Sequence, residues 1–145
     1  MIKKYSLKKA ILLVFAFILT GIMRFLLLAV PFRYIAAFMG KEKSESPESV
    51  DNVKFSKARI IGRTVIAVSG HTPWKSECLV QALTAQAILR IFKIPNTLYL
   101  GMAKDDSNKL SAHAWLRCGH AVITGGLISE EFKVVAQYSN NFDQE

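Results

Sequence analysis

The sequence of 145 residues has the length of one ordinary domain, which excludes a chain of two full-sized domains. Its 51% hydrophobic and 21% charged residues exclude a disordered protein, and two cysteines are too few for a disulfide scaffold. The net charge of +8 is concentrated at one end, because residues 1–33 hold six Lys and Arg and no acid, while the rest is close to neutral. We therefore expect no nucleic-acid partner.

Residues 1–40 are predicted to form an apolar N-terminal helical segment. Arg24 is the only ionisable residue between positions 10 and 32, and this stretch is long enough to span a membrane. Preceding lysines are typical of a span and also of a signal peptide, although no small-x-small cleavage site follows. The third interpretation is a helix that packs on protein and ends at Pro31, followed by a short helix at Tyr34–Met39. We expect a cytoplasmic protein, with contact of residues 10–32 with the inner face of the membrane left open.

Residues 41–57 are predicted to be a polar linker, and residues 58–145 the domain. The stretch KEKSESPESVDN at 41–52 is too polar to bury much surface. A helical spacing of apolar residues follows it, at Ala58, Ile61, Val65 and Val68. The segment Ser69–Pro73 then ends this first helix.

A second helix is expected from Ser76, a good N-cap residue, to about Phe92. Gly119 and His120 are predicted to form a two-residue hairpin turn. Four stretches with strand composition follow the helix: Thr97–Ala103, Ala112–Cys118, Ala121–Thr124 and Phe132–Tyr138. A helix followed by strands that pair antiparallel predicts an α+β domain.

Cys78 lies at the start of the second predicted helix, at its second position if Ser76 is the N-cap. Free backbone N–H groups and the positive end of the helix dipole favour negative charge there, and the thiolate is the nucleophilic form. The same N–H groups can bind the oxyanion of an attacked carbonyl. A lone cysteine is also compatible with a small buried apolar residue.

His113 is the histidine best placed to act as a base. It lies between two alanines on a predicted strand, with Trp115 on the same face. A cysteine on a helix facing a histidine on a strand is the working pair of cysteine proteases and transglutaminase-type enzymes. His120 is predicted to be solvated in the turn, and His71 lies in the segment that ends the first helix. No metal or cofactor is expected, because neither C-x-x-C nor H-x-x-x-H spacing joins the possible zinc ligands Cys78, Cys118, His113 and His120.

Two stretches, PWKSECLVQALTAQAILRIFKIPNTLYLGMAKD and LSAHAWLRCGHAVITGG, resemble the B2 proteins of lasso-peptide biosynthesis. The similarity runs from about Ala58 to Tyr138. The shared features are Pro73-Trp74, Cys78-Leu79, Gln81-Ala82, Ile94-Pro95, Leu98-Tyr99-Leu100-Gly101, His113-Ala114-Trp115 and Thr124-Gly125-Gly126. The resemblance implies a transglutaminase-like or papain-like core with N-terminal apolar helices.

The resemblance also implies a leader peptidase. Such an enzyme removes the leader from a ribosomally made precursor, so that a lasso cyclase can join the freed core N-terminus to an acidic side chain. In the stand-alone B2 type, a separate leader-binding B1 protein delivers the precursor peptide. The sequence before Ala58 offers no recognition domain, which agrees with that type.

In this family Cys78 would attack the scissile carbonyl, and His113 would take its proton and return it to the leaving amine. The family has a Cys-His-Asp triad, but the strand opposite His113 ends in Ile123-Thr124-Gly125-Gly126 without a carboxylate. Thr124 or a backbone carbonyl is therefore the expected orienting group. Weaker candidates in predicted loops are Asp105, Asp106, Glu130 and Glu131.

Trp74 and Gln81 are candidates for lining the cleft or completing an oxyanion hole. The alternatives are a packed aromatic for Trp74 and a backbone cap for Gln81. Two other functions also stay open for the whole chain. One is a non-catalytic, membrane-associated adaptor of a peptide maturation complex, and the other is acyl transfer by the same Cys-His pair.

Overall fold

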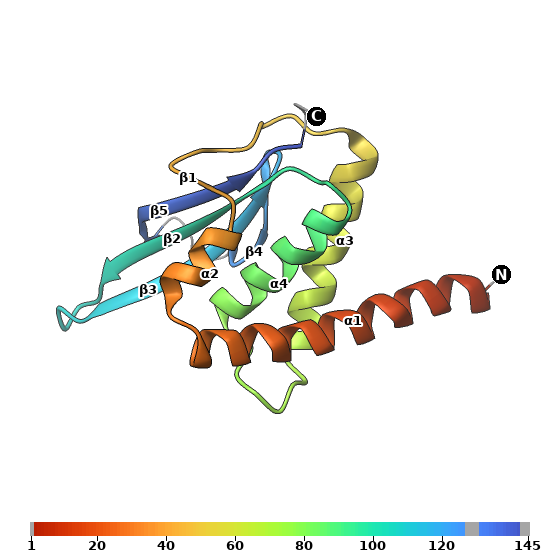
Figure 1. Ribbon diagram of the computed structural model, residues 1–145, viewed down its shortest axis with the longest axis horizontal. Coiled ribbons are helices and arrows are strands. Elements are labelled where there is room, and N and C mark those ends of the chain that lie inside the picture. The colour runs from red at the N-terminus through yellow and green to blue at the C-terminus, as the bar shows by residue number, and fades with distance from the viewer. Residues whose placement is uncertain (1, 127–130, 143–145) are drawn as a thin grey trace.

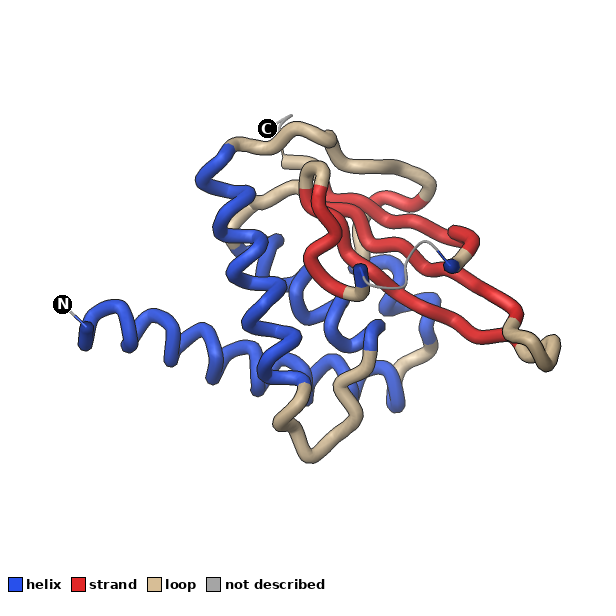
Figure 2. The backbone as a smooth tube through the Cα atoms, turned by 180° about the vertical axis from the view of Figure 1, so that it is seen from behind, coloured by secondary structure: helices blue, strands red, loops and turns tan. Residues whose placement is uncertain are grey.

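Helices cover one face of an antiparallel sheet in the computed structural model, which describes residues 2–126 and 131–142 (Figures 1 and 2). The predicted α+β class is confirmed. In chain order, the described elements are α1 (Ile2–Ala29), α2 (Phe32–Phe38), β1 (Lys41–Glu42), α3 (Asn52–Ser69), α4 (Cys78–Ile91), β2 (Asn96–Lys104), β3 (Leu110–Cys118), β4 (Ala121–Thr124) and β5 (Lys133–Asn140).

The strands are arranged in the order β1-β5-β2-β3-β4, and each neighbouring pair is antiparallel. The four strands predicted from composition are confirmed, as is the turn between β3 and β4, where Gly119 has a φ of 59°. The register of β2 and β3 places Gly101 opposite His113. The residue paired with the predicted base on the neighbouring strand is therefore a glycine.

The core lies between α3, α4 and one face of the sheet. The apolar side chains predicted to line the first helix, from Ala58 to Val68, are buried. Ala114 and Leu116 of β3 belong to the same buried cluster. Because side chains alternate along a strand, His113 does not belong to this cluster.

The polar stretch after α2 is mostly an exposed loop, as predicted, but Lys41–Glu42 form β1 and Ser46 is buried. Arg117 of β3 donates to the carbonyl of Ser46 at 2.8 Å and to the hydroxyl of Tyr99 at 3.0 Å. The buried Ser46 also donates from its backbone N–H to Thr97 Oγ1 at 2.8 Å. The partly buried Arg117 thus supplies hydrogen-bond partners that this stretch lacks on its own.

The predicted end of the linker at residue 57 is wrong, because α3 begins at Asn52. Asp51 caps this helix by accepting a hydrogen bond from the backbone N–H of Lys54 at 3.4 Å. The short strand β1 within the stretch pairs with Ser139 and Tyr138 of β5. An aspartate at an N-cap is a strong start signal that the polar composition concealed.

The N-terminal segment is helical as predicted, with α1 ending at Ala29 and α2 beginning after Pro31. The helix α1 packs against α3 and α4, and its N-terminal half extends beyond the rest of the molecule (Figures 1 and 2). The residues from Leu7 to Ala29 are long and apolar enough to cross a membrane, with a mean hydropathy of 2.6. Only 11% of their most apolar window is buried in the molecule.

Candidate active site

Cys78 is the first residue of α4, and Glu77 is the N-cap residue. The prediction of Ser76 as N-cap is wrong, because its hydroxyl bonds to Thr72 Oγ1 at 2.7 Å instead. The Glu77 side chain makes no capping hydrogen bond, so the N-cap residue does not occupy the first N–H groups of the helix. Cys78, partly exposed, therefore lies beside N–H groups that remain available to an oxyanion.

His113 is nine-tenths buried, and its Nε2 atom lies 2.7 Å from the carbonyl oxygen of Gly125. A carbonyl oxygen only accepts hydrogen bonds, so Nε2 must carry the proton that it donates. In the neutral ring the other nitrogen, Nδ1, is then left with a free lone pair. This hydrogen bond sets the tautomer that a general base needs.

Aromatic rings surround the imidazole of His113. The Phe132 ring lies 5.0 Å away and the Trp115 ring 5.8 Å away, between ring centroids. Gly101 makes room for both neighbours, because a Cβ atom there would lie 2.8 Å from the Trp115 ring and from Phe132 Cβ. Trp115 on the face of His113 was predicted from strand alternation, whereas nothing in the sequence marked Phe132.

Cys78 and His113 are carried by neighbouring elements, since α4 packs against β3. No hydrogen bond joins the two side chains among the residues that the structure describes. Catalytic hydrogen bonds are often long in free enzymes and tighten when substrate binds. Cys78 packs against the buried cluster on the helix-covered face of the sheet, whereas His113 lies on the other face of β3, so adjacent elements carry the two side chains on different sides of the sheet.

The group that orients His113 is the Gly125 carbonyl and not the Thr124 hydroxyl, which is buried and has no hydrogen-bond partner among the described residues. Asp105 lies at the β2–β3 turn, where hydrogen bonds from the Ser107 side chain and the Lys109 backbone lower the pKa of its carboxyl. The acids at positions 106 and 131 are exposed, and Glu130 lies outside the described residues. The Gly125-Gly126 pair was a sequence signal for an unusual backbone, and Gly125 has a φ of 72°.

Trp74 packs against α1. Its Nε1 donates to Thr20 Oγ1 at 3.1 Å, and its ring lies 5.1 Å from that of Phe17. Gln81 donates from Nε2 to the Ser76 carbonyl at 2.9 Å. These contacts are the packing and capping alternatives given above, and they tie the segment before Cys78 to α1 and to the first turn of α4.

The other cysteine and histidines lie elsewhere. Cys118 is fully buried at the end of β3, and burial raises the pKa of its thiol to about 11. His120 is exposed in the β3–β4 turn and stacks on Phe55 at 4.7 Å, and His71 is exposed after α3. Within residues 2–126 and 131–142, no three His, Cys, Asp or Glu side chains are grouped as metal ligands.

A profile of the transglutaminase-like superfamily matches residues 24–137. The chain belongs to the transglutaminase-like superfamily. This superfamily includes cysteine peptidases and acyltransferases, and its enzymes commonly use a cysteine. The match covers both Cys78 and His113, and it reaches back into the C-terminal part of α1. Searches of curated proteins and of solved structures find no match.

The two cysteines of this transglutaminase-like chain are expected to differ in their reaction with iodoacetamide at neutral pH. Only on the order of 10⁻⁴ of Cys118 would be thiolate at neutral pH, and the residue is fully buried. Mass spectrometry of the native protein should therefore show one adduct, at Cys78, and two adducts in denaturant. Cys118→Ala should keep the native adduct and Cys78→Ala should lose it, whereas rapid native labelling of Cys118 would contradict its burial.

Proposed function

We propose that this transglutaminase-like chain is a cysteine peptidase that removes the leader from a ribosomally made lasso-peptide precursor. The observation that carries the proposal is the hydrogen bond from His113 to the Gly125 carbonyl, which leaves the second ring nitrogen free to act as a base. A second observation supports it: Cys78 is the first residue of α4, and the N-cap residue Glu77 makes no side-chain capping hydrogen bond. The resemblance of both surrounding segments to B2 proteins supplies the substrate class.

The proposed reaction requires Cys78 and His113 to come together, and its steps use these two groups. His113 takes the proton of Cys78, and the sulfur attacks the carbonyl carbon at the leader–core junction. The N–H groups at the start of α4 stabilise the oxyanion. The imidazolium returns its proton to the leaving amine, which frees the core N-terminus and leaves the leader as a thioester. Water, activated by His113, hydrolyses the thioester and releases the leader as an acid.

A separate leader-binding B1 protein is proposed to deliver the precursor, and a lasso cyclase to take up the freed core. The aromatic rings of Trp115 and Phe132 beside His113 would exclude water from the base when a peptide is bound. The same groups would carry out acyl transfer if an amine replaced water as the acceptor. Product masses therefore decide the reaction class.

The test is reconstitution of the purified chain with a precursor peptide and its leader-binding protein, followed by mass spectrometry. A peptidase yields two fragments whose masses add up to the precursor plus one water. Acyl transfer yields a product that contains the leader joined to an added amine. Precursor that stays intact while the three components form a complex would indicate an adaptor and contradict the proposal.

A further inference from the structure

From Ala10 to Ala29 the helix α1 is apolar apart from Thr20 and Arg24, and only one of its sides is covered. The covered side holds Ala16 and Thr20, both fully buried, and the Trp74 indole that bonds to Thr20. The opposite side exposes large apolar residues at helical spacing over about 30 Å of helix, given 1.5 Å per residue. These residues, here called the exposed α1 face, are Leu7, Ile11, Val14, Ile18, Ile22, Phe25 and Leu28, each 48–70% exposed.

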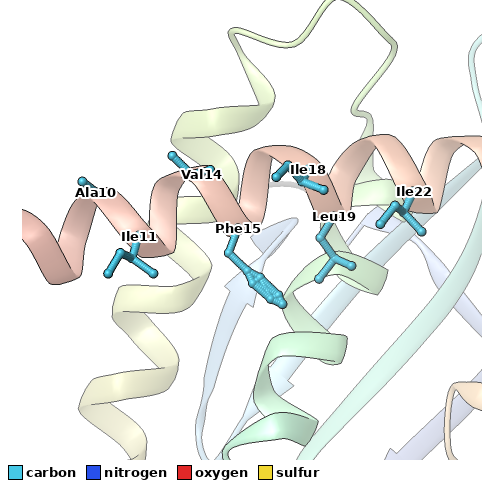
Figure 3. Close-up of a pocket in the computed structure, with 7 residues that line it drawn as sticks. All are labelled: Ala10, Ile11, Val14, Phe15, Ile18, Leu19 and Ile22. Atoms are coloured by element: carbon cyan, nitrogen blue, oxygen red, sulfur yellow. The ribbon is translucent and has the colours of Figure 1, made fainter.

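The exposed α1 face is continuous and not a scatter of single residues. Ile11, Val14, Ile18 and Ile22 line an apolar groove along α1 (Figure 3). Scattered apolar residues are normal on a soluble surface, but a contiguous apolar band of this length marks a site of contact. A helix that is apolar all round is stable where both of its sides are covered.

The charge around this face identifies its occupant. Residues 1–41 contain no Asp or Glu, and Lys8 and Lys9 flank the face at one end while Arg33 follows it at the other. A second copy of the chain would bring two strongly basic segments together, which like-charge repulsion opposes. The occupant must cover apolar side chains and tolerate the basic residues beside them. An anionic bilayer does both, since its acyl chains cover apolar side chains and its headgroups attract basic ones.

The packing of α1 on the domain also indicates whether α1 would lie on the bilayer or cross it. Gly21 allows close contact with the indole, because a Cβ atom there would lie 2.9 Å from Trp74. A helix that crossed the membrane would lose this contact, the Thr20 bond and the packing on α3 and α4. We propose that α1 lies in the plane of an anionic membrane surface, with its exposed face in the lipid and the domain on its other side.

The test adds the full chain to vesicles of phosphatidylcholine with phosphatidylglycerol, and to vesicles of phosphatidylcholine alone, and measures co-flotation. Binding should be stronger to the anionic vesicles and should weaken with added salt. The double variant Ile18→Gln/Phe25→Gln should lower the partition coefficient about tenfold or more. The matched control Ile91→Gln/Val135→Gln, at two residues that are 62% and 61% exposed elsewhere, should bind like the wild type.

A second measurement separates lying on the membrane from crossing it. In a Trp115→Phe background, Trp74 is the one remaining tryptophan of the sequence, so its emission reports the α1 contact. We expect this emission to stay unchanged on vesicle binding, and an alkaline carbonate wash to release the protein. Resistance to the wash, a red shift of Trp74, or equal binding to both vesicle types would overturn the proposal. So would loss of self-association, in place of loss of lipid binding, in the Ile18→Gln/Phe25→Gln variant.

Discussion

Leader removal is expected to fall by about 10³-fold or more when either Cys78 or His113 is replaced by alanine. Cys78→Ala removes the atom that would form the thioester, and His113→Ala removes the proposed base that takes and returns the thiol proton. The two losses should not add, because the groups act as one unit. The measurement is kcat/KM for precursor cleavage with the leader-binding protein present.

Two further variants separate chemistry from folding. His113→Gln keeps an N–H donor for the Gly125 carbonyl but has no basic nitrogen, so it should be as inactive as His113→Ala. His113→Ala should lose about 1–3 kcal/mol of stability, because it leaves that carbonyl unpaired. Cys118→Ala should retain nearly full activity, since Cys118 is fully buried and burial raises the pKa of its thiol to about 11. Cleavage by Cys78→Ala at more than a tenth of the wild-type rate would rule out the proposed mechanism.

The strands and the second helix were predictable from sequence because their signals are local. Pro95 and the turn at Gly119 and His120 mark ends of elements, and apolar residues between them repeat at strand or helix spacing. The same local signals placed Cys78 at a helix start and His113 on a strand. The candidate nucleophile and base thus follow from patterns within a few residues.

The parts that sequence did not predict depend on contacts between distant segments. The strand β1 is two residues long and exists because β5 offers it an edge. The polar stretch around Ser46 is ordered by Arg117, which lies 71 positions later in the chain. No composition rule applied to this stretch alone could find a partner on another strand.

For the same reason, the sequence left open which of two groups orients His113. The absence of a carboxylate at the end of β4 was read correctly, but it left Thr124 and a backbone carbonyl as alternatives. Only the register between β3 and β4, with its irregularity after Leu116, decides which atom reaches the ring. It places the Gly125 carbonyl there, and within residues 2–126 and 131–142 the Thr124 hydroxyl has no hydrogen-bond partner.

Gly125→Ala is expected to lower both activity and stability, although the substitution adds a single methyl group. Gly125 has a φ of 72°, a conformation that costs an alanine about 1–2 kcal/mol. A Cβ atom there would also lie 2.5 Å from the Ala114 carbonyl oxygen and 3.1 Å from His113 Nε2. The backbone must therefore move away from β3 and take its carbonyl out of reach of the imidazole.

A displacement of about 1 Å at an orienting group can cost about 10²-fold in rate, so kcat should fall by that order while KM changes little. Gly126→Ala is the matched control, because the nearest described atoms to its Cβ would be those of the Val122 side chain, at 3.2 Å and 3.3 Å. In ¹⁵N-histidine-labelled protein, the hydrogen-bonded Nε2–H signal of His113 should disappear in Gly125→Ala and persist in Gly126→Ala. A Gly125→Ala protein that loses stability but keeps this signal and its kcat would show that Gly125 supports the fold without positioning the base.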